Sequence, residues 1–208
     1  PLVRIKYALL LALAPLLAAN GWIELQYFLG LKANVITSCC GSLFSEGSPT
    51  LAAEASAMKP LPAIWLFYGA LGTTIAVAAW HGWRGGRGNA SAYALATASA
   101  LAFAATIAGI LSFVSLYVYE HPNHHCPFCI LKPEYGYQGY LLYLPLFVAT
   151  AAGLAVGAVQ PFAGRESLRG IVPAFSRHLA AVAANGFALT AAIATAMIWQ
   201  SRLILLEH

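Results

Sequence analysis

The sequence contains no aspartate, and only 9% of its 208 residues are charged. Water-soluble domains carry charge on about a quarter of their residues, so such a domain is excluded as the fold of most of this chain. Hydrophobic residues make up 60% of the chain, and its mean hydropathy is +0.72. A core surrounded by water cannot hide this much apolar surface, so lipid is expected to be the solvent for most of it.

Three nucleotide and haem motifs are also missing. The sequence has no Walker phosphate-binding loop, no Rossmann glycine pattern and no Cys-x-x-Cys-His motif of c-type haem. ATP-driven transport by this chain alone is therefore not expected. The formal net charge of +4 does not indicate a nucleic-acid partner, because an excess of lysine and arginine in a membrane protein reflects its cytoplasmic loops.

Long apolar stretches dominate what is present. A helix needs about 20 apolar residues to cross a bilayer, and helices are expected because open strands would leave backbone groups unpaired in lipid. The fold class predicted is all-α, a polytopic membrane helix bundle with about five transmembrane helices. Residues 1–205 are expected to form this single domain, and 206–208 resemble the remnant of an affinity tag. The predicted spans cover about residues 5–29, 61–80, 92–119, 137–159 and 179–199.

Basic residues predict the orientation of the spans. Seven of them lie at the N-terminus and in the second and fourth connections, which the positive-inside rule assigns to the cytoplasm. Only four lie on the other side, where glutamates offset them. We therefore expect an integral protein of a bacterial inner membrane, with its N-terminus cytoplasmic and its C-terminus extracytoplasmic. The seven are Arg4, Lys6, Arg84, Arg87, Arg165, Arg169 and Arg177, and the four are Lys32, Lys59, Lys132 and Arg202.

Two extracytoplasmic loops, at about residues 32–60 and 120–136, concentrate the reactive side chains. The first contains Cys39 and Cys40, and the second contains Cys126 and Cys129. The second loop also holds three of the six histidines: His121, His124 and His125. Long loops are common places for the chemistry of a protein. An extracytoplasmic compartment is oxidising, so disulfides can persist there.

The spacing of the cysteines restricts how they pair. Consecutive Cα atoms are about 3.8 Å apart, below the usual disulfide range, so a bond between Cys39 and Cys40 would be strained and easily reduced. Cys126 and Cys129 enclose Pro127 and Phe128, and such a turn closes a disulfide readily. We expect Cys126, the first thiol, to be the more acidic and the more exposed, and a protonated neighbouring imidazole to stabilise its thiolate.

Three functions fit this constellation. In the first, the two pairs, Cys39–Cys40 and Cys126–Cys129, pass electrons by thiol–disulfide exchange. In the second, the loop binds or transports copper or zinc, ions that suit thiolate and imidazole ligands. In the third, the cysteines brace the loops of a structural subunit. The ligands in the metal-binding alternative would be His121, His124, His125, Cys126 and Cys129.

Two loops that each carry a cysteine pair on a small helix bundle resemble the membrane thiol oxidoreductases of the DsbB and vitamin K epoxide reductase type. The resemblance implies that one pair exchanges with a periplasmic thiol-redox protein and the other with a bound quinone. By this likeness Cys126 and Cys129 are the quinone-side pair and Cys39 and Cys40 the shuttle pair, or the reverse. The chain departs from the pattern in its adjacent first pair and its fifth helix. Small membrane carriers of mercury and copper also use adjacent cysteines, and there the partner would be a metal-carrier protein.

A few other polar and aromatic residues complete the candidate site. Glu24 lies in or at the end of the first span, and an ionisable group there is a functional candidate. Tyr137 and Tyr140 are outer aromatics, and with Glu24 they are the expected quinone-binding residues. His81 and His178 lie near the cytoplasmic boundary and are expected to be interfacial.

Overall fold

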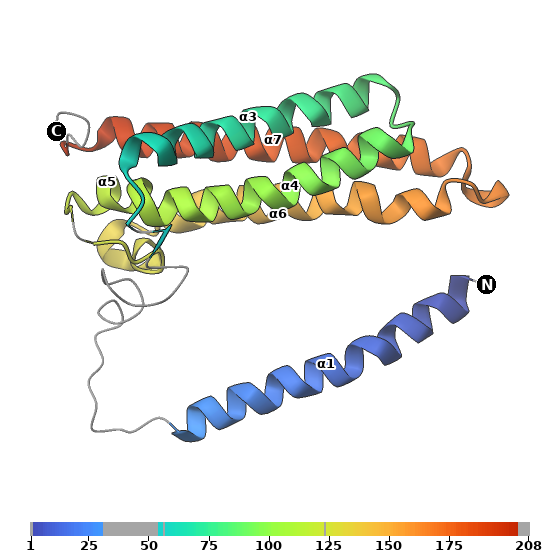
Figure 1. Ribbon diagram of the computed structural model, residues 1–208, viewed down its shortest axis with the longest axis horizontal. Helices are drawn as coiled ribbons and strands as arrows, with labels where there is room; N and C mark the ends of the chain where they lie inside the picture. The colour runs from blue at the N-terminus through green and yellow to red at the C-terminus, as the bar shows by residue number, and fades with distance from the viewer. Residues whose placement is uncertain (1, 31–53, 56, 123, 204–208) are drawn as a thin grey trace. The chain divides into compact units, whose positions relative to one another are not determined.

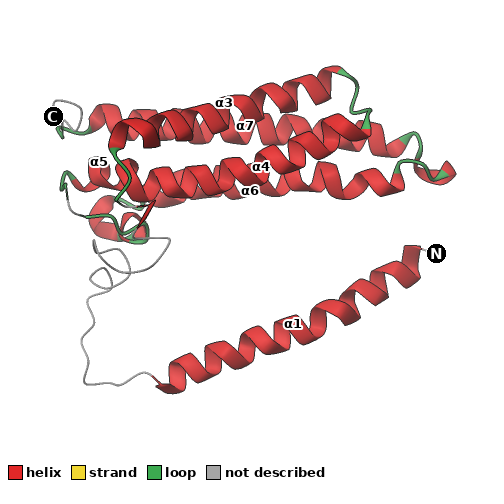
Figure 2. Ribbon diagram, viewed as in Figure 1, coloured by secondary structure: helices red, strands yellow, loops and turns green. Residues whose placement is uncertain are grey.

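The computed structural model describes residues 2–30, 54–55, 57–122 and 124–203. Its contacts divide the chain into two units, Pro1–Ser38 and Cys39–His208. Cys39 and Cys40 lie outside the described residues. Wherever the structure describes the chain, it consists of helices and turns and contains no strand (Figure 2).

The described residues of the first unit form one helix, α1 (Leu2–Gly30). Its alanine- and leucine-rich sequence favours helix, and Pro15 lies inside it. Asn20 donates a hydrogen bond from Nδ2 to Glu24 Oε1, 3.1 Å away and one turn later. Every side chain of α1 that the structure describes is exposed. The expectation that this helix joins one bundle with the others stays a prediction.

The second unit is built on four long antiparallel helices (Figure 1). Each helix packs against two others: α3 and α6 both contact α4 and α7, so the four form a closed square. Short connections at one end of the square carry Arg84, Arg87 and Arg165; we call this the arginine end. The four helices are α3 (Pro60–Trp83), α4 (Asn89–Gly109), α6 (Gln138–Val159) and α7 (Ile171–Gln200).

The opposite end, which we call the cysteine end, is more elaborate. Helix α4 continues through a π-helical turn, η1 (Ile110–Val114), into the short helix α5 (Ser115–Tyr119). The chain then folds back over the end of the bundle through two 3-10 turns, η2 (Cys129–Leu131) and η3 (Pro133–Tyr135), before α6 begins. This end therefore carries the Cys-x-x-Cys segment.

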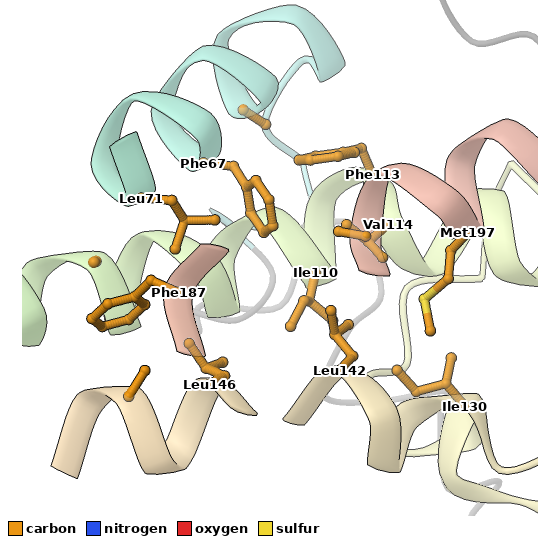
Figure 3. Close-up of a cluster of buried hydrophobic side chains, with 14 of the residues drawn as sticks. Phe67, Leu71, Ile110, Phe113, Val114, Ile130, Leu142, Leu146, Phe187 and Met197 are labelled. Atoms are coloured by element: carbon orange, nitrogen blue, oxygen red, sulfur yellow. The ribbon is translucent and has the colours of Figure 1, made fainter. Parts of the chain in front are cut away.

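Apolar side chains from all four helices fill the centre of the bundle (Figure 3). Phe67 of α3 lies edge-on against Phe113 of the π-helical turn, with ring centroids 5.5 Å apart. Ile130 of η2 is also fully buried in this core. Burying such a side chain stabilises the fold by about 1.5–3 kcal/mol, so Ile130 anchors the cysteine segment to the bundle. The labelled core residues are Phe67, Leu71, Ile110, Phe113, Val114, Ile130, Leu142, Leu146, Phe187 and Met197.

Small residues allow the helices to approach closely. A Cβ atom at Gly153 of α6 would lie 1.9 Å from Ser99 Oγ of α4, so only glycine fits at this crossing. Close approach through glycine, alanine and serine is typical of helix packing in lipid. Helices α4 and α6 therefore make a tight contact at this crossing.

Among the residues that the structure describes, five helices are long and apolar enough to cross a membrane, which agrees with the all-α prediction of about five spans. Large apolar side chains also cover the outside of the bundle, among them Trp65, Leu101, Leu144 and Leu189. The last helix differs from the prediction, because it begins at Ile171 instead of near residue 179. The first turns of α7 contain polar residues such as Ser176. Their lower hydropathy made the apolar run look shorter than the helix is.

Candidate functional site

The loop at the cysteine end begins where α5 stops. Glu120 ends the helix in the left-handed conformation, with a φ of 51°. Its carboxylate Oε1 accepts a hydrogen bond from the Arg202 backbone N–H, 2.9 Å away, just beyond α7. This contact ties the start of the loop to the end of the last helix.

The Cys126-Pro127-Phe128-Cys129 segment forms a turn that leads into the short η2 helix. The Leu131 N–H donates to the Phe128 carbonyl at 3.1 Å, and the Lys132 N–H donates to the Cys129 carbonyl at 3.0 Å. Proline at the second position suits a turn because its φ angle is already restricted. Ile130 in the core then holds the turn against the bundle.

Two tyrosines hold the backbone of this turn from opposite sides. The Tyr119 hydroxyl of α5 donates to the Cys126 carbonyl. The Tyr143 hydroxyl of α6 donates to the Pro127 carbonyl at 2.8 Å. Buried carbonyls need donors, and these two come from different helices. The position of the turn is therefore determined by the packing of α5 and α6.

Both cysteine side chains of the turn are buried: Cys126 is 0% exposed and Cys129 is 5% exposed. The expectation of an exposed first thiol is wrong, because the tyrosine contacts and Ile130 hold the turn against the helices. Phe128, between the two cysteines, is 62% exposed. The Phe128 ring is therefore accessible to a water-soluble reagent, whereas the two thiols beside it are buried.

The three histidines of the loop lie in different surroundings. His121 is exposed. His124 stacks on Tyr119, with ring centroids 4.1 Å apart. Partial burial, and then the nearby His121, His125 and Lys132, lower the pKa of His124 below its usual value. His124 is thus neutral near pH 7 and does not supply the positive charge expected beside the thiolate.

His125 turns toward the bundle. Its Nδ1 lies 2.8 Å from the Leu111 carbonyl oxygen, and because a carbonyl only accepts, Nδ1 carries the hydrogen. Within the described part of the chain, no group of three or more histidine, cysteine or acidic side chains is arranged to hold a metal ion. The expected ligands His121, His124, His125, Cys126 and Cys129 are therefore neighbours that do not form such a group.

An apolar cavity of about 420 Å³ opens beside the cysteine turn. It lies between α4 and α6, and Pro127 and Phe128, the two residues between the cysteines, form part of its wall. Cavities of this size accommodate small organic ligands. The remaining lining residues are Ile107, Leu131, Tyr140, Tyr143, Leu144, Phe147 and Val148.

The three expected quinone-binding residues fall in different places. Tyr140 lines the cavity. Tyr137 lies next to it, with a ring centroid 6.2 Å from that of Tyr140. Glu24 belongs to α1, in the other unit, where Asn20 is its hydrogen-bond partner.

Comparison with known proteins adds no constraint on this site. No protein-family model, curated protein or solved structure matches the chain. The chemistry of the cysteine end therefore follows from the residues that form it.

Several residues of the site were not identified from the sequence. Tyr119 and Tyr143 were not singled out from the sequence, although both bind the backbone of the cysteine turn. The spacing of Tyr140 and Tyr143, three residues apart on one helix face, was a usable signal. Leu111 has no signal at all, because only its backbone carbonyl takes part.

A second buried polar cluster lies at the arginine end. His81, in the last turn of α3, is fully buried between helices, which its expected interfacial position did not predict. Its Nδ1 is 2.8 Å from Ser91 Oγ of α4, and its Nε2 is 2.8 Å from Ser176 Oγ of α7. The imidazole thus joins three helices. It lies at the opposite end of the bundle from the cysteine turn.

Proposed function

We propose that the protein is a membrane thiol–disulfide electron-transfer protein and that Cys126 and Cys129 are its reacting pair. The observation that carries the proposal is the position of the Cys-Pro-Phe-Cys turn. Its cysteines are shielded from water, while the two residues between them line an apolar cavity. Such a pair suits a reaction partner that arrives through the bilayer.

The exchange reaction conserves bonds and electrons. A thiolate of the pair attacks one sulfur of an incoming disulfide, which forms a mixed disulfide and releases one thiolate of the incoming pair. The second cysteine then attacks the mixed disulfide, closes the Cys126–Cys129 bond and releases the other thiolate. Two electrons and two protons have then left the Cys126–Cys129 pair for the incoming pair. In the reverse reaction an incoming dithiol attacks the Cys126–Cys129 disulfide, leaves as a disulfide and returns two electrons and two protons to the pair, which can then pass them to an acceptor.

A quinone is the cofactor that fits the cavity, because the lining is almost entirely apolar and aromatic. When bound, a quinone accepts two electrons and two protons from a dithiol. Tyr140 and Phe147 of α6 would hold its ring or tail by apolar contact. Tyr143 would keep the cysteine turn at the edge of the cavity, through its hydrogen bond to Pro127.

The wider setting belongs to the same proposal. The chain lies in a bacterial inner membrane with the cysteine end outside, as the arginine-rich connections of the opposite end favour. Cys39 and Cys40 are the second pair, and they exchange with a soluble dithiol protein in the extracytoplasmic compartment. The partners are therefore lipid, a quinone and a thiol-redox protein.

A turnover assay on the full chain in detergent micelles tests the proposal. A reduced dithiol serves as electron donor and a short-tailed quinone as acceptor, and quinone reduction is followed by absorbance. Cys126→Ser and Cys129→Ser should each reduce the rate to background, because the exchange needs both sulfurs. His178→Ala, at the other end of the bundle, is the matched control and should keep the wild-type rate.

Replacing His121, His124 and His125 together by alanine separates this function from metal transport. A redox site should keep measurable turnover, because neighbouring imidazoles only adjust the thiol pKa. A copper or zinc site should lose its bound ion as completely as a cysteine variant does, since each ligand contributes a coordinate bond. Stoichiometric metal in the purified protein, lost in the triple variant, together with no quinone reduction, would overturn the redox proposal.

A further inference from the structure

Helix α4 reaches the cysteine end through a π-helical turn, Ile110–Val114. The Ser115 backbone N–H donates to the carbonyl of Ile110, five residues earlier. An α-helix would direct this N–H to Leu111, four residues earlier. The Leu111 carbonyl thereby loses its usual donor. The whole turn is buried, so this carbonyl needs a donor from elsewhere.

His125 provides that donor from the cysteine loop. Its Nδ1–H points to the Leu111 carbonyl oxygen at 2.8 Å, which is a good hydrogen-bond distance. The Ser115 hydroxyl also reaches this carbonyl, but at 3.5 Å. The shorter bond therefore ties the residue just before Cys126 to the π-helical turn.

The next residue of the same turn, Ser112, bonds to the chain just before α3. The Ser112 hydroxyl donates to the Met58 carbonyl at 3.2 Å. Met58 lies just before α3, at the end of the first cysteine-bearing loop, and its side chain packs against the main core. Ser112 itself is 1% exposed. Leu111 and Ser112, adjacent in one helix turn, thus bind His125 and Met58, respectively.

We infer that the π-helical turn is the junction that couples the Cys126–Cys129 loop to residues 57–60, which lead into α3, with His125 and Ser112 as positioning residues. As a statement about the thiol site, this rests on the proposed function. His125 acts through the hydrogen on Nδ1. The contribution inferred for His125 is therefore a hydrogen bond.

Two variants of His125 test this role. His125→Asn keeps an N–H donor near the position of Nδ1 but removes the ionisable ring, whereas His125→Leu removes the donor. Hydrogen exchange of the full chain in micelles, read by mass spectrometry, should rise about fivefold in residues 121–132 of His125→Leu, the effect of losing one hydrogen bond. His125→Asn should stay near the wild-type rates. Equal loss in both variants would overturn the inference.

The junction also predicts an effect at a distance. Ser112→Ala removes the bond to Met58, yet it should raise exchange in residues 121–132 as well as in residues 57–60. Ser112→Thr should restore the protection of both segments. Thr150→Ala is the matched control, because it removes a buried hydroxyl of α6 that bonds within its own helix and touches neither loop. If Ser112→Ala loosens only residues 57–60, the two segments are not coupled and the inference fails.

The turnover assay separates this inference from the proposed function. With an active thiol site, His125→Leu and Ser112→Ala should lower the rate of quinone reduction several-fold, while His125→Asn and Ser112→Thr keep it. If the protein is active but these variants leave its hydrogen-exchange rates unchanged, the inferred junction is refuted and the proposed function stands. If the variants change hydrogen exchange as expected but the protein has no thiol turnover, the junction stands and the proposed function is refuted.

Discussion

The two ends of the bundle each place a histidine below the surface, but with different partners. At the arginine end, His81 is fully buried and both of its ring nitrogens meet serine hydroxyls. At the cysteine end, His125 is partly exposed and its Nδ1 binds a backbone carbonyl. The first imidazole connects three helices that already pack together. The second connects a loop to a helix whose hydrogen-bond pattern has been interrupted.

The two ends also differ in how regular their backbone is. At the arginine end, Gly86 adopts a φ of 70°, and a Cβ atom there would lie 2.1 Å from the Pro173 carbonyl oxygen. That connection is short and closely packed. At the cysteine end, the π-helical turn and two 3-10 turns replace regular helix. Irregular backbone that is buried needs protein partners for its polar groups, and at this end the Leu111 carbonyl meets His125.

The largest expected effect would break the arginine end. His81→Leu removes two buried hydrogen bonds and leaves the Ser176 hydroxyl buried without its partner, so the free energy of unfolding should fall by about 2–4 kcal/mol. Unfolding in mixed detergent micelles measures it. His178→Leu, on the exposed side of α7, should change the value by less than about 0.5 kcal/mol.

A double variant checks the reason for this effect. Adding Ser176→Ala to His81→Leu removes the buried hydroxyl that lost its partner, so part of the lost stability should return. Quinone reduction, measured where the protein is folded, should stay at the wild-type rate throughout. A loss of turnover larger than the loss of folded protein would contradict the contrast between the two ends.

A smaller effect sharpens the description of the cysteine end. Tyr143→Phe removes the hydrogen bond to the Pro127 carbonyl, worth about 1 kcal/mol, and leaves the ring in the cavity wall. The turn should open more often, so the alkylation rate of Cys126 and Cys129 should rise roughly fivefold. Tyr140→Phe changes the same cavity wall without touching the turn, and it should leave this rate unchanged. Equal rates in the two variants would show that Tyr143 does not hold the turn.

The sequence predicted the helices well and the site only in part. Apolar runs identify helices because lipid exposure leaves a strong compositional signal, and the span of residues 61–80 corresponds to α3, Pro60–Trp83. The burial of His81 was missed because its serine partners lie on other helices, 10 and 95 residues away. The π-helical turn was missed for a similar reason: its contacts are with Met58 and His125, which are distant in sequence and follow no local pattern. Cys39 and Cys40 lie outside the described residues, so their approach to Cys126 stays a prediction.

The smallest expected effect concerns pH at the cysteine end. The pKa of His124 is lowered by partial burial and by His121, His125 and Lys132, so the folded protein binds fewer protons at this site than the unfolded chain. Stability therefore rises with pH between the folded pKa and the unfolded value of 6.5, and it declines as the pH falls from 6.5 toward the folded pKa. Below that lower value the contribution levels off.

His124→Phe isolates this contribution, because phenylalanine can keep the stacking on Tyr119 but cannot take up a proton. Unfolding is measured from neutral pH to about pH 5, a range in which an ordinary imidazole titrates. The wild type should lose stability over this range faster than the variant does, while the two differ little in slope above about pH 7. A wild type and a His124→Phe variant with identical slopes would mean that His124 is as well solvated in the folded protein as in the unfolded chain. Burial of the stacked His124 imidazole would then make no pH-dependent contribution to the stability of the loop that contains Cys126 and Cys129.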